Sequence, residues 1–309
     1  TIRSVIEARC AATERIMAAT ARPYRSTLYI PGSKDRALEK ARTLPVDAII
    51  FDLEDAVAVE EKDNARTLLA AELATGGYGG RSQIVRLNGQ DTPWGAADLV
   101  AIMDVAPQAV LLPKVETVVQ VAEVAAKLDA HPDCADTQIW AMMETPAGIL
   151  NAAALAKAPR MAGFVLGTND LAKDLSCRFR PDRLPLQMSL QTCLLAARAA
   201  GIMCLDGVYN AYKDEAGLQA ECAQGRDLGM DGKTLIHPAQ VAIANAAFAP
   251  TEAEVDLARR QIAAFEEARA AGQGVAVVDG AIVENLHIET AEATLAKAQA
   301  IAALEAEAT

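Results

Sequence analysis

The sequence has few aromatic residues, few histidines and no long hydrophobic run. Only 4% of its 309 residues are aromatic, and only three are histidine. No stretch reaches the roughly 18 to 20 uninterrupted apolar residues that a membrane-spanning helix needs. The first residues also lack the apolar core that is typical of a signal peptide. We therefore expect a soluble protein.

Paired cysteines are absent, and basic residues are outnumbered. The six cysteines form no CxxC pair, which favours a reducing cytoplasm over a disulfide-stabilised secreted protein. The chain carries 29 basic and 41 acidic residues, so its formal net charge is −12. Such a surface repels phosphate backbones and anionic lipid, so we expect neither a nucleic-acid nor a membrane partner. Any anionic ligand then needs a local basic pocket.

Several catalytic motifs are also missing. No GxGxxG follows the first expected strand, and neither a GxSxG nor a convincing Ser/His/Asp set is found. Dinucleotide-dependent chemistry and covalent acyl transfer are therefore disfavoured. Metal-assisted chemistry on carboxylates remains.

Eight apolar runs of strand length alternate with segments of helical periodicity. The expected strands are residues 27–30, 48–51, 83–87, 109–112, 138–143, 163–166, 202–205 and 234–236. This alternation implies parallel crossovers, and eight units over about 220 residues favour a closed barrel over an open doubly wound sheet. The predicted fold class is α/β, a (β/α)8 TIM barrel over residues 1–250 that includes an N-terminal accessory helix.

The pattern of residues 251–309 predicts a separate C-terminal module of helices and a hairpin. Thr251 and Glu254 form a capping box that opens a helix. Asp279-Gly280 is typical of a type I′ hairpin turn, and a last helix is expected over 289–304. About 60 residues are too few to hold a core alone, so we expect this lid module to pack on its own barrel or on a neighbouring subunit.

Polar or charged residues follow each expected strand. In a TIM barrel these positions meet at the C-terminal mouth, where active sites lie. The residues at these positions include the proline Pro31 and the charged or polar residues Asp52, Arg86, Lys114, Glu144, Asp170, Asp206 and His237. Glu144 and Asp170 end neighbouring strands and form an oxygen-ligand pair suited to Mg²⁺. The alternative is that each carboxylate caps the helix that follows.

Two charged groups offer further candidates. Asp52, Glu54 and Asp55 either hold a metal and its waters or pair with Arg86 across the mouth. Arg86 interrupts an apolar run, so its side chain is expected to point into the barrel top. There it can hold a carboxylate or neutralise a developing oxyanion.

Basic residues after the first strand and a histidine after the eighth complete the candidates. Lys34, Arg36 and Lys40 form either a patch for an anionic ligand or a solvated helix face. His237 has no second His or Cys at metal-ligand spacing, so we favour a hydrogen-bonding or packing role for it.

These residues occur in motifs that resemble the citrate lyase β-subunit-like (HpcH/HpaI aldolase) family. The resemblance covers roughly residues 24–305. It rests on Leu28-Tyr29-Ile30-Pro31-Gly32-Ser33, Asp52-Leu53-Glu54-Asp55, Arg86-Leu87-Asn88, Pro113-Lys114, Glu144-Thr145, Gly167-Thr168-Asn169-Asp170, and Gly232-Lys233 leading to Ile236-His237-Pro238. Each motif alone is weak, but seven in order at the ends of barrel strands are specific.

The resemblance implies a TIM barrel with a C-terminal lid, Mg²⁺ or its substitute Mn²⁺, and CoA thioesters of hydroxy-dicarboxylic acids. It also implies trimers or hexamers in which the lid closes a neighbouring subunit's site. On this resemblance Glu144 and Asp170 are the metal ligands, Arg86 clamps the thioester, and Asp52 and Glu54 hold the metal's waters. The positions that match contacts to CoA or substrate are Tyr29, Lys34, Lys40, Asn169, Asp170, Ile236 and His237.

The lid departs from the family pattern at one position. Lyases of the family place a catalytic Asp after the hairpin, where this sequence has Ile282-Val283-Glu284-Asn285. Segments 140–145, 166–175 and 284–287 look most like the branch that hydrolyses the thioester of (3S)-malyl-CoA. The resemblance thus implies release of malate and CoA, with Arg86 polarising the carbonyl and Glu284 activating water.

Three other functions stay open. A retro-Claisen lyase acting on malyl-CoA, methylmalyl-CoA or citramalyl-CoA would release a 2-oxo acid. A metal-dependent aldolase of free 2-oxo acids would ignore CoA. A CoA-binding or assembly subunit without independent turnover would bind the thioester and leave it intact.

Overall fold

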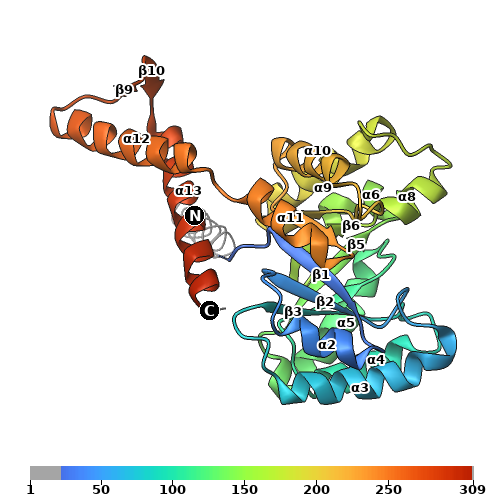
Figure 1. Cartoon of the computed structure of the whole chain (residues 1–309). Helices are drawn as coiled ribbons and strands as arrows, with labels where there is room; N and C mark the ends of the chain where they lie inside the picture. Colours follow the sequence, from blue (N-terminus) through green and yellow to red (C-terminus); the bar gives the residue numbers. More distant parts are fainter. Residues whose placement is uncertain (1–21, 308–309) are drawn as a thin grey trace, which may run out of the picture. The chain divides into compact units, whose positions relative to one another are not determined.

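The computed structural model describes residues 22–307, in which eight parallel strands form a closed barrel in sequence order (Figure 1). The strands are β1 (Ser26–Pro31), β2 (Ala48–Asp52), β3 (Ser82–Arg86), β4 (Ala109–Leu112), β5 (Gln138–Met143), β6 (Met161–Leu166), β7 (Met203–Asp206) and β8 (Gly232–Leu235). Strand β8 pairs with β1 and closes the ring. The predicted TIM barrel is confirmed, and each predicted strand end lies within two residues of the observed one.

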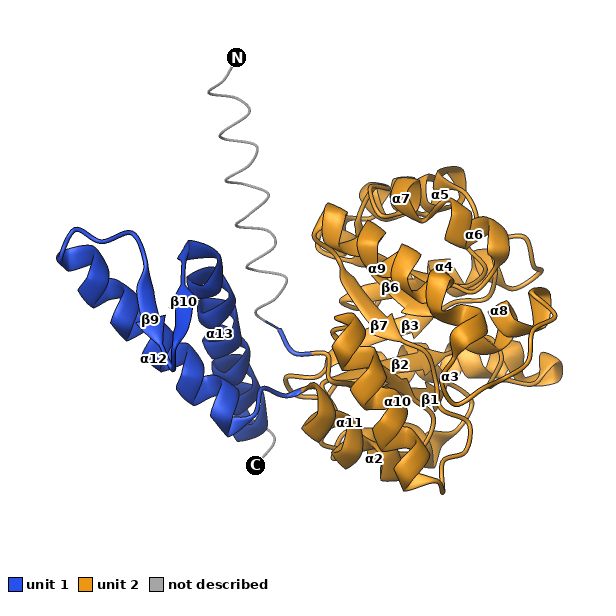
Figure 2. Cartoon of the chain, turned by 90° about the horizontal axis from the view of Figure 1, so that it is seen from above, with its two compact units in different colours: residues 1–23, 249–307, 309 blue, residues 24–248, 308 orange. Residues whose placement is uncertain are grey.

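Helices follow the strands and cover the outside of the barrel (Figure 2). They are α2 (Asp35–Ala41), α3 (Lys62–Thr75), α4 (Gly95–Met103), α5 (Val118–Ala130), α6 (Pro146–Leu150), α7 (Ala152–Leu155), α8 (Thr168–Asp174), α9 (Gln187–Ala200), α10 (Glu215–Leu228) and α11 (Val241–Phe248). Short 3-10 turns are η1 (Val59–Glu61), η2 (Pro132–Cys134), η3 (Leu184–Leu186) and η4 (Pro238–Gln240). Helix α5 illustrates why these segments form helices that pack on the barrel. Its buried residues Val121, Val124 and Leu128 recur every three or four residues, which places them on one face of the helix.

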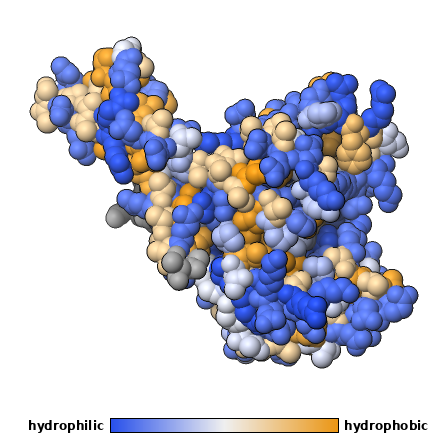
Figure 3. All heavy atoms as spheres, in the orientation of Figure 1, coloured by the Kyte–Doolittle hydropathy of each residue, from blue (hydrophilic) through white to orange (hydrophobic). Residues whose placement is uncertain are grey.

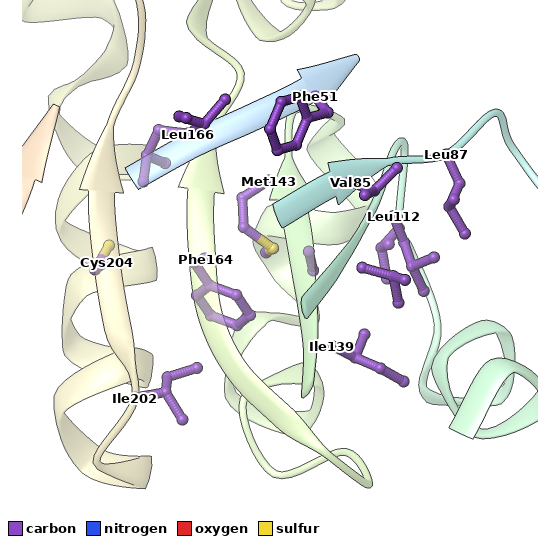
Figure 4. Close-up of a cluster of buried hydrophobic side chains, with 14 of the residues drawn as sticks. Phe51, Val85, Leu87, Leu112, Ile139, Met143, Phe164, Leu166, Ile202 and Cys204 are labelled. Atoms are coloured by element: carbon purple, nitrogen blue, oxygen red, sulfur yellow. The ribbon is translucent and has the colours of Figure 1, made fainter. Parts of the chain in front are cut away.

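Side chains along each strand alternate between two apolar clusters, because successive residues of a strand point to opposite faces. Ile49 and Phe51 join the outer cluster between strands and helices, part of which Figure 4 shows. Ile50, between them, belongs to a second cluster that fills the barrel interior. Ile84 and Met142 are further members of this inner cluster. The residues two positions after these inner ones therefore face the mouth of the barrel, namely Asp52, Arg86 and Glu144.

Residues 249–307 group into a compact unit of their own, separate from the barrel unit Tyr24–Phe248. It consists of α12 (Glu252–Ala270), a hairpin of β9 (Ala276–Val278) and β10 (Ala281–Val283), and α13 (Asn285–Glu307). The capping box of Thr251 and Glu254 is present. The hairpin turn has positive φ at both central residues, Asp279 (51°) and Gly280 (80°), as a type I′ turn requires.

The last helix begins four residues before its predicted start. The Glu284 N–H donates to His287 Nδ1 at 3.0 Å, so a histidine caps the helix where a Glu or Gln is usual. The predicted N-terminal accessory helix falls largely on residues 1–21, outside the described residues. Among residues 22–307, no helix combines the length and apolar composition that crossing a membrane requires.

Candidate active site

A pocket of about 450 Å³ opens at the carboxyl ends of the barrel strands. Its lining includes seven of the residues singled out above, which come from the ends of six strands: Tyr29, Asp52, Arg86, Glu144, Asn169, Asp170 and Ile236. Residues far apart in the sequence thus surround one cavity, because parallel strands all end on the same side of the barrel.

Arg86 is the buried cation of this pocket. Its Nε and Nη2 donate to the two carboxylate oxygens of Asp52 at 2.7 and 2.6 Å. Its Nη1 lies 3.0 Å from Glu54 Oε2 and 3.3 Å from Asp55 Oδ2. Burial alone would lower the pKa of Arg86, but the neighbouring carboxylates raise it well above its ordinary value. The guanidinium therefore stays charged at any working pH.

The acidic segment after β2 is built around Arg86. Of the two alternatives for this segment, the structure displays the pairing with Arg86. Asp52 also accepts the backbone N–H groups of Glu54 and Ala56, both at 2.9 Å, which folds the segment back on itself. Lys114 Nζ donates to Glu54 Oε1 at 2.8 Å. Burial raises the pKa of Glu54, although Arg86 and Lys114 oppose this.

Glu144 faces the pocket from the end of β5 with only 1% of its surface exposed. Its Oε1 accepts the Lys114 backbone N–H at 2.8 Å, and within the described residues Glu144 forms no salt bridge. Burial raises its pKa to about 7, more than the Lys114 N–H lowers it. Gly167 makes room for this carboxylate, since a Cβ there would collide with Glu144 Cβ and Oε2.

Asp170 is the third residue of α8 and is half-buried. In the described part of the chain its carboxylate forms neither a hydrogen bond nor a salt bridge. The capping alternative fails for both carboxylates. Thr145 caps α6 by accepting the Gly148 N–H at 3.1 Å, and α8 has no side-chain cap.

The donor set around Glu144 and Asp170 fits Mg²⁺. Among residues 22–307, no three His, Cys, Asp or Glu side chains gather into a complete metal cage. Mg²⁺ does not need one, because it usually takes one or two carboxylates and fills its other positions with water and substrate. A buried carboxylate without a cationic side-chain partner, as in Glu144, is costly, and a divalent cation would remove that cost.

Tyr29 brings a hydroxyl to the pocket from β1. Its ring lies under the Arg86 guanidinium, with 4.9 Å from Cζ to the ring centroid. The hydroxyl donates to Met142 Sδ at 3.4 Å, and a thioether is a weak acceptor. Burial raises the pKa of Tyr29. The phenol therefore stays protonated, and its hydroxyl donates only a weak hydrogen bond in the described residues.

The remaining candidates lie around the rim or in the other unit. His237 Nδ1 accepts the Ala239 N–H at 3.1 Å and its ring stacks on Tyr212 at 4.5 Å, so it both hydrogen-bonds and packs. Lys34, Arg36 and Lys40 are exposed at the start of and along α2. Glu284 belongs to the C-terminal unit, where it is exposed between β10 and α13.

One expectation about the mouth is wrong. Asp206 points away from the barrel interior toward α10, where a Cβ on Gly225 would meet its Oδ2 at 2.8 Å. It accepts from Arg183 Nη1, just before η3, at 2.6 Å and from Lys233 Nζ, on β8, at 3.2 Å. The reason is strand parity, because Leu205 occupies the inner cluster and its neighbour must face outward. The sequence also gave no signal for buried Lys62, which contacts the acidic segment after β2 from the helix that follows it.

Comparison with known proteins finds one matching family model and several similar enzymes. The family model HpcH/HpaI aldolase/citrate lyase matches residues 25–238. A protein named (3S)-malyl-CoA thioesterase from Cereibacter sphaeroides strain KD131 is 62% identical over 290 residues, which cover 94% of this chain and the full length of that protein. Citrate lyase subunit beta from Escherichia coli K12 is 36% identical over 284 residues, covering 90% of this chain and 94% of that protein.

Two solved structures are also similar to this chain. Mycobacterium tuberculosis CitE in complex with magnesium, acetoacetate and coenzyme A superposes with a TM-score of 0.74 and is 30% identical. The match covers 89% of this chain and 97% of that protein. A citrate lyase beta subunit from the same organism, complexed with oxaloacetate and magnesium, has a TM-score of 0.65 and covers 75% of this chain and 99% of its own.

Proposed function

This chain belongs to the HpcH/HpaI aldolase/citrate lyase family, and we propose that it hydrolyses the thioester of (3S)-malyl-CoA to malate and CoA with Mg²⁺. Its 62% identity to proteins named for this activity supports the proposal. The observation that carries it is one pocket that holds a buried guanidinium, Arg86, beside two carboxylates, Glu144 and Asp170, that form no salt bridge within residues 22–307.

Glu144 and Asp170 hold the metal in this proposal, and Mn²⁺ would suit the same oxygen ligands. When bound, Mg²⁺ would supply positive charge for the carboxylate and hydroxyl oxygens of the malyl group. Asp52 and Glu54 hold water near it and fix Arg86. Arg86 donates to the thioester carbonyl oxygen and stabilises the negative charge that develops there.

The CoA part of the substrate is bound by residues around the pocket. Lys34 and Lys40 are exposed cations on a chain of net charge −12, which suits them to the phosphates of CoA. Ile236 and Asn169 line the pocket itself, and His237 follows Ile236. Tyr29 contacts the acyl end.

Water attack needs a base close to the carbonyl carbon, and we assign this role to Glu284 of a neighbouring copy. Its carboxylate is exposed and, within residues 22–307, has no hydrogen bond or salt bridge. Glu284 takes a proton from water as the oxygen bonds to the carbonyl carbon. The carbon–sulfur bond then breaks and CoA leaves as its thiolate, which is protonated to the free thiol.

The assignment of Glu284 requires an oligomer, a trimer or hexamer in which residues 251–309 act as a lid on the neighbour. Properties of the C-terminal unit support this. Among the described residues, the hydrophobic cluster of this unit has four buried members, Ala268, Ala276, Val278 and Val283. Val277, Ile282 and Leu286 stay 58 to 65% exposed, and Figure 3 shows hydrophobic atoms among hydrophilic ones on this unit. Light scattering on the purified chain measures the oligomeric state.

A lyase is the second candidate, because the citrate lyase relatives share the family and the same metal and arginine would serve carbon–carbon cleavage. Cleavage of malyl-CoA, methylmalyl-CoA or citramalyl-CoA would give a 2-oxo acid and an acyl-CoA.

The proposed function also includes a cytoplasmic location, which the five free cysteines of the described residues support.

The decisive experiment incubates the purified full chain with (3S)-malyl-CoA, with and without Mg²⁺. A thiol reagent follows free CoA, and a hydrazine follows glyoxylate. Metal-dependent release of CoA and malate without glyoxylate is the expected result. Glyoxylate with acetyl-CoA would identify a lyase instead, and bound thioester without either product would identify a CoA-binding subunit.

A further inference from the structure

Lys62, the first residue of α3, is a buried cation outside the pocket. It is 6% exposed, and the pocket lining does not include it. Its Nζ donates to the carbonyl oxygens of Leu53 at 2.9 Å and Glu54 at 2.7 Å, and to Asn88 Oδ1 at 2.8 Å. An ammonium has three protons, so these three acceptors use its full capacity. Lys62 thus ties the segment after β2 to the segment after β3.

Asn88 reinforces this tie from the other side. Its Nδ2 donates to the Leu53 carbonyl at 2.9 Å and to Asp98 Oδ2 at 2.6 Å. Asp98, on α4, is fully buried and accepts from Arg66 Nε at 2.8 Å. The Leu53 carbonyl therefore receives two donors, and both are anchored to helices rather than to a flexible loop.

The fixed segment is the one that holds Arg86. The Leu53 N–H donates to the Arg86 carbonyl at 2.9 Å. Lys62 fixes the carbonyl of Glu54, while the Glu54 side chain lies 3.0 Å from Arg86 Nη1. A displacement of the Leu53–Glu54 backbone would therefore move a carboxylate that orients the guanidinium.

We propose that Lys62 is a positioning residue for the reaction, whose ammonium fixes the Leu53–Glu54 backbone so that Glu54 holds Arg86 toward the thioester. The inference rests on the proposed function for its catalytic consequence. A buried cation that, like Lys62, forms no salt bridge within the described residues is expensive to keep. The cost of burying Lys62 is explained if Arg86 needs the backbone geometry that Lys62 fixes, since small misplacements of a catalytic group reduce the rate steeply.

The test combines Lys62→Met with Glu54→Gln in a double-mutant cycle on the full chain with Mg²⁺. Lys62→Met keeps an unbranched side chain as far as Cε and removes the ammonium with its donors. We expect kcat for CoA release to fall about tenfold or more with KM changed less than about threefold. Because both residues act through Arg86, kcat of the double variant is expected to lie no more than about twofold below that of the slower single variant.

Arg66→Met is the matched control, because Arg66 belongs to the same buried network but does not contact residues 52–55. It is expected to keep kcat within about threefold while lowering the melting temperature. Wild-type kcat in Lys62→Met, or additive losses in the double variant, would overturn the proposal. Lys62→Arg is the second variant if Lys62→Met does not fold, because a planar guanidinium cannot aim at the same three acceptors. It too must lose kcat.

A readout independent of turnover separates this inference from the proposed function. The Nε–H resonance of Arg86, assigned by its absence from Arg86→Lys, reports how firmly the guanidinium is held. Its hydrogen exchange with water is expected to be faster in Lys62→Met than in the wild type and unchanged in Arg66→Met. If the wild type releases no CoA, the proposed function fails, while unchanged Arg86 exchange in Lys62→Met overturns the positioning role.

Discussion

Arg86 and Asp52 form a two-pronged ion pair at the mouth of the barrel, with nitrogen–oxygen distances of 2.7 and 2.6 Å. The two residues are register partners on adjacent strands, so the sheet itself places them side by side. Their side chains are only 8% and 1% exposed. The cation that meets the substrate in our proposal is therefore held by backbone pairing as well as by charge.

Arg86→Lys is expected to reduce kcat/KM for CoA release about a hundredfold or more. A lysine ammonium is a point charge that cannot bridge both oxygens of Asp52 and still present a donor in the same plane. The thiol assay measures the loss. Arg160→Lys is the control, because Arg160, just before β6, donates to backbone carbonyls just before β5, at the opposite end of the barrel. A loss below about tenfold in Arg86→Lys would contradict the assigned role.

Gly167→Ala is expected to weaken Mg²⁺ binding about tenfold or more, because its Cβ would occupy the space of the Glu144 carboxylate. Isothermal titration with Mg²⁺ measures the affinity without any substrate. Gly274→Ala is the matched control, since a Cβ there meets no atom within 4 Å. Equal affinities of the two variants would show that Glu144 is not a ligand.

The mouth residues could be predicted because each follows an apolar run of strand length, and parallel strands all end on the same side of a barrel. The structure shows that Ile50, Ile84 and Met142 face inward, so the charged residues two positions later also face inward. The sequence does not show which residues of a strand face inward, because runs such as Ile49-Ile50-Phe51 and Met203-Cys204-Leu205 are both apolar throughout. The orientation of Asp206 could therefore not be predicted from the sequence.

Lys62 could not be predicted for a different reason. It meets the Leu53 and Glu54 carbonyls across an irregular connection, residues 53–61, whose path no periodicity determines. The early start of α13 was missed because His287 takes the capping position that a sequence pattern reserves for Glu or Gln. Regular elements follow from side-chain periodicity, whereas such contacts depend on the folded path of connecting segments.

Tyr29→Phe is expected to leave the melting temperature unchanged and to lower kcat about tenfold. Stability is preserved because, within residues 22–307, the lost hydroxyl bonds only a thioether sulfur, Met142 Sδ, at 3.4 Å. The rate falls if the hydroxyl turns to the acyl oxygen beside Arg86. Met142→Leu removes the sulfur and keeps the hydroxyl, so it should retain kcat. Unaltered turnover in Tyr29→Phe would exclude contact with the reacting group.

Asp206→Asn is expected to destabilise the barrel by about 3 kcal/mol at neutral pH, because it removes the fully buried one of the two carboxylates that Arg183 and Lys233 share, leaving only Glu221. Burial raises the pKa of Asp206, but the two cations outweigh it and the net pKa lies below the ordinary value. The unfolded chain therefore binds the proton first as the pH falls. The stabilisation is complete above about pH 5 and is lost on acidification below about pH 4.

Urea midpoints of wild type and Asp206→Asn, measured between about pH 7 and about pH 3, check this dependence. The gap between the two proteins should narrow as the pH falls. Asp63→Asn is the control, because the Asp63 side chain is 83% exposed and its ion pair contributes little. A gap that stays constant with pH would mean that Asp206 is not ionised in the folded protein.

Glu284→Asp tests what decides between hydrolysis and carbon–carbon cleavage. The family resemblance implies that Glu284 stands where the lyases have Asp, and the two carboxylates differ by one methylene, a reach of about 1 Å. Hydrolysis needs a base beside the carbonyl carbon, whereas cleavage needs removal of the hydroxyl proton and protonation of the enolate. Shortening the side chain should therefore lower CoA release and raise glyoxylate release from (3S)-malyl-CoA. Glu284→Gln, which keeps the length and removes the base, should lose both products. An unchanged ratio of glyoxylate to free CoA in Glu284→Asp would assign the choice of reaction to the barrel residues instead.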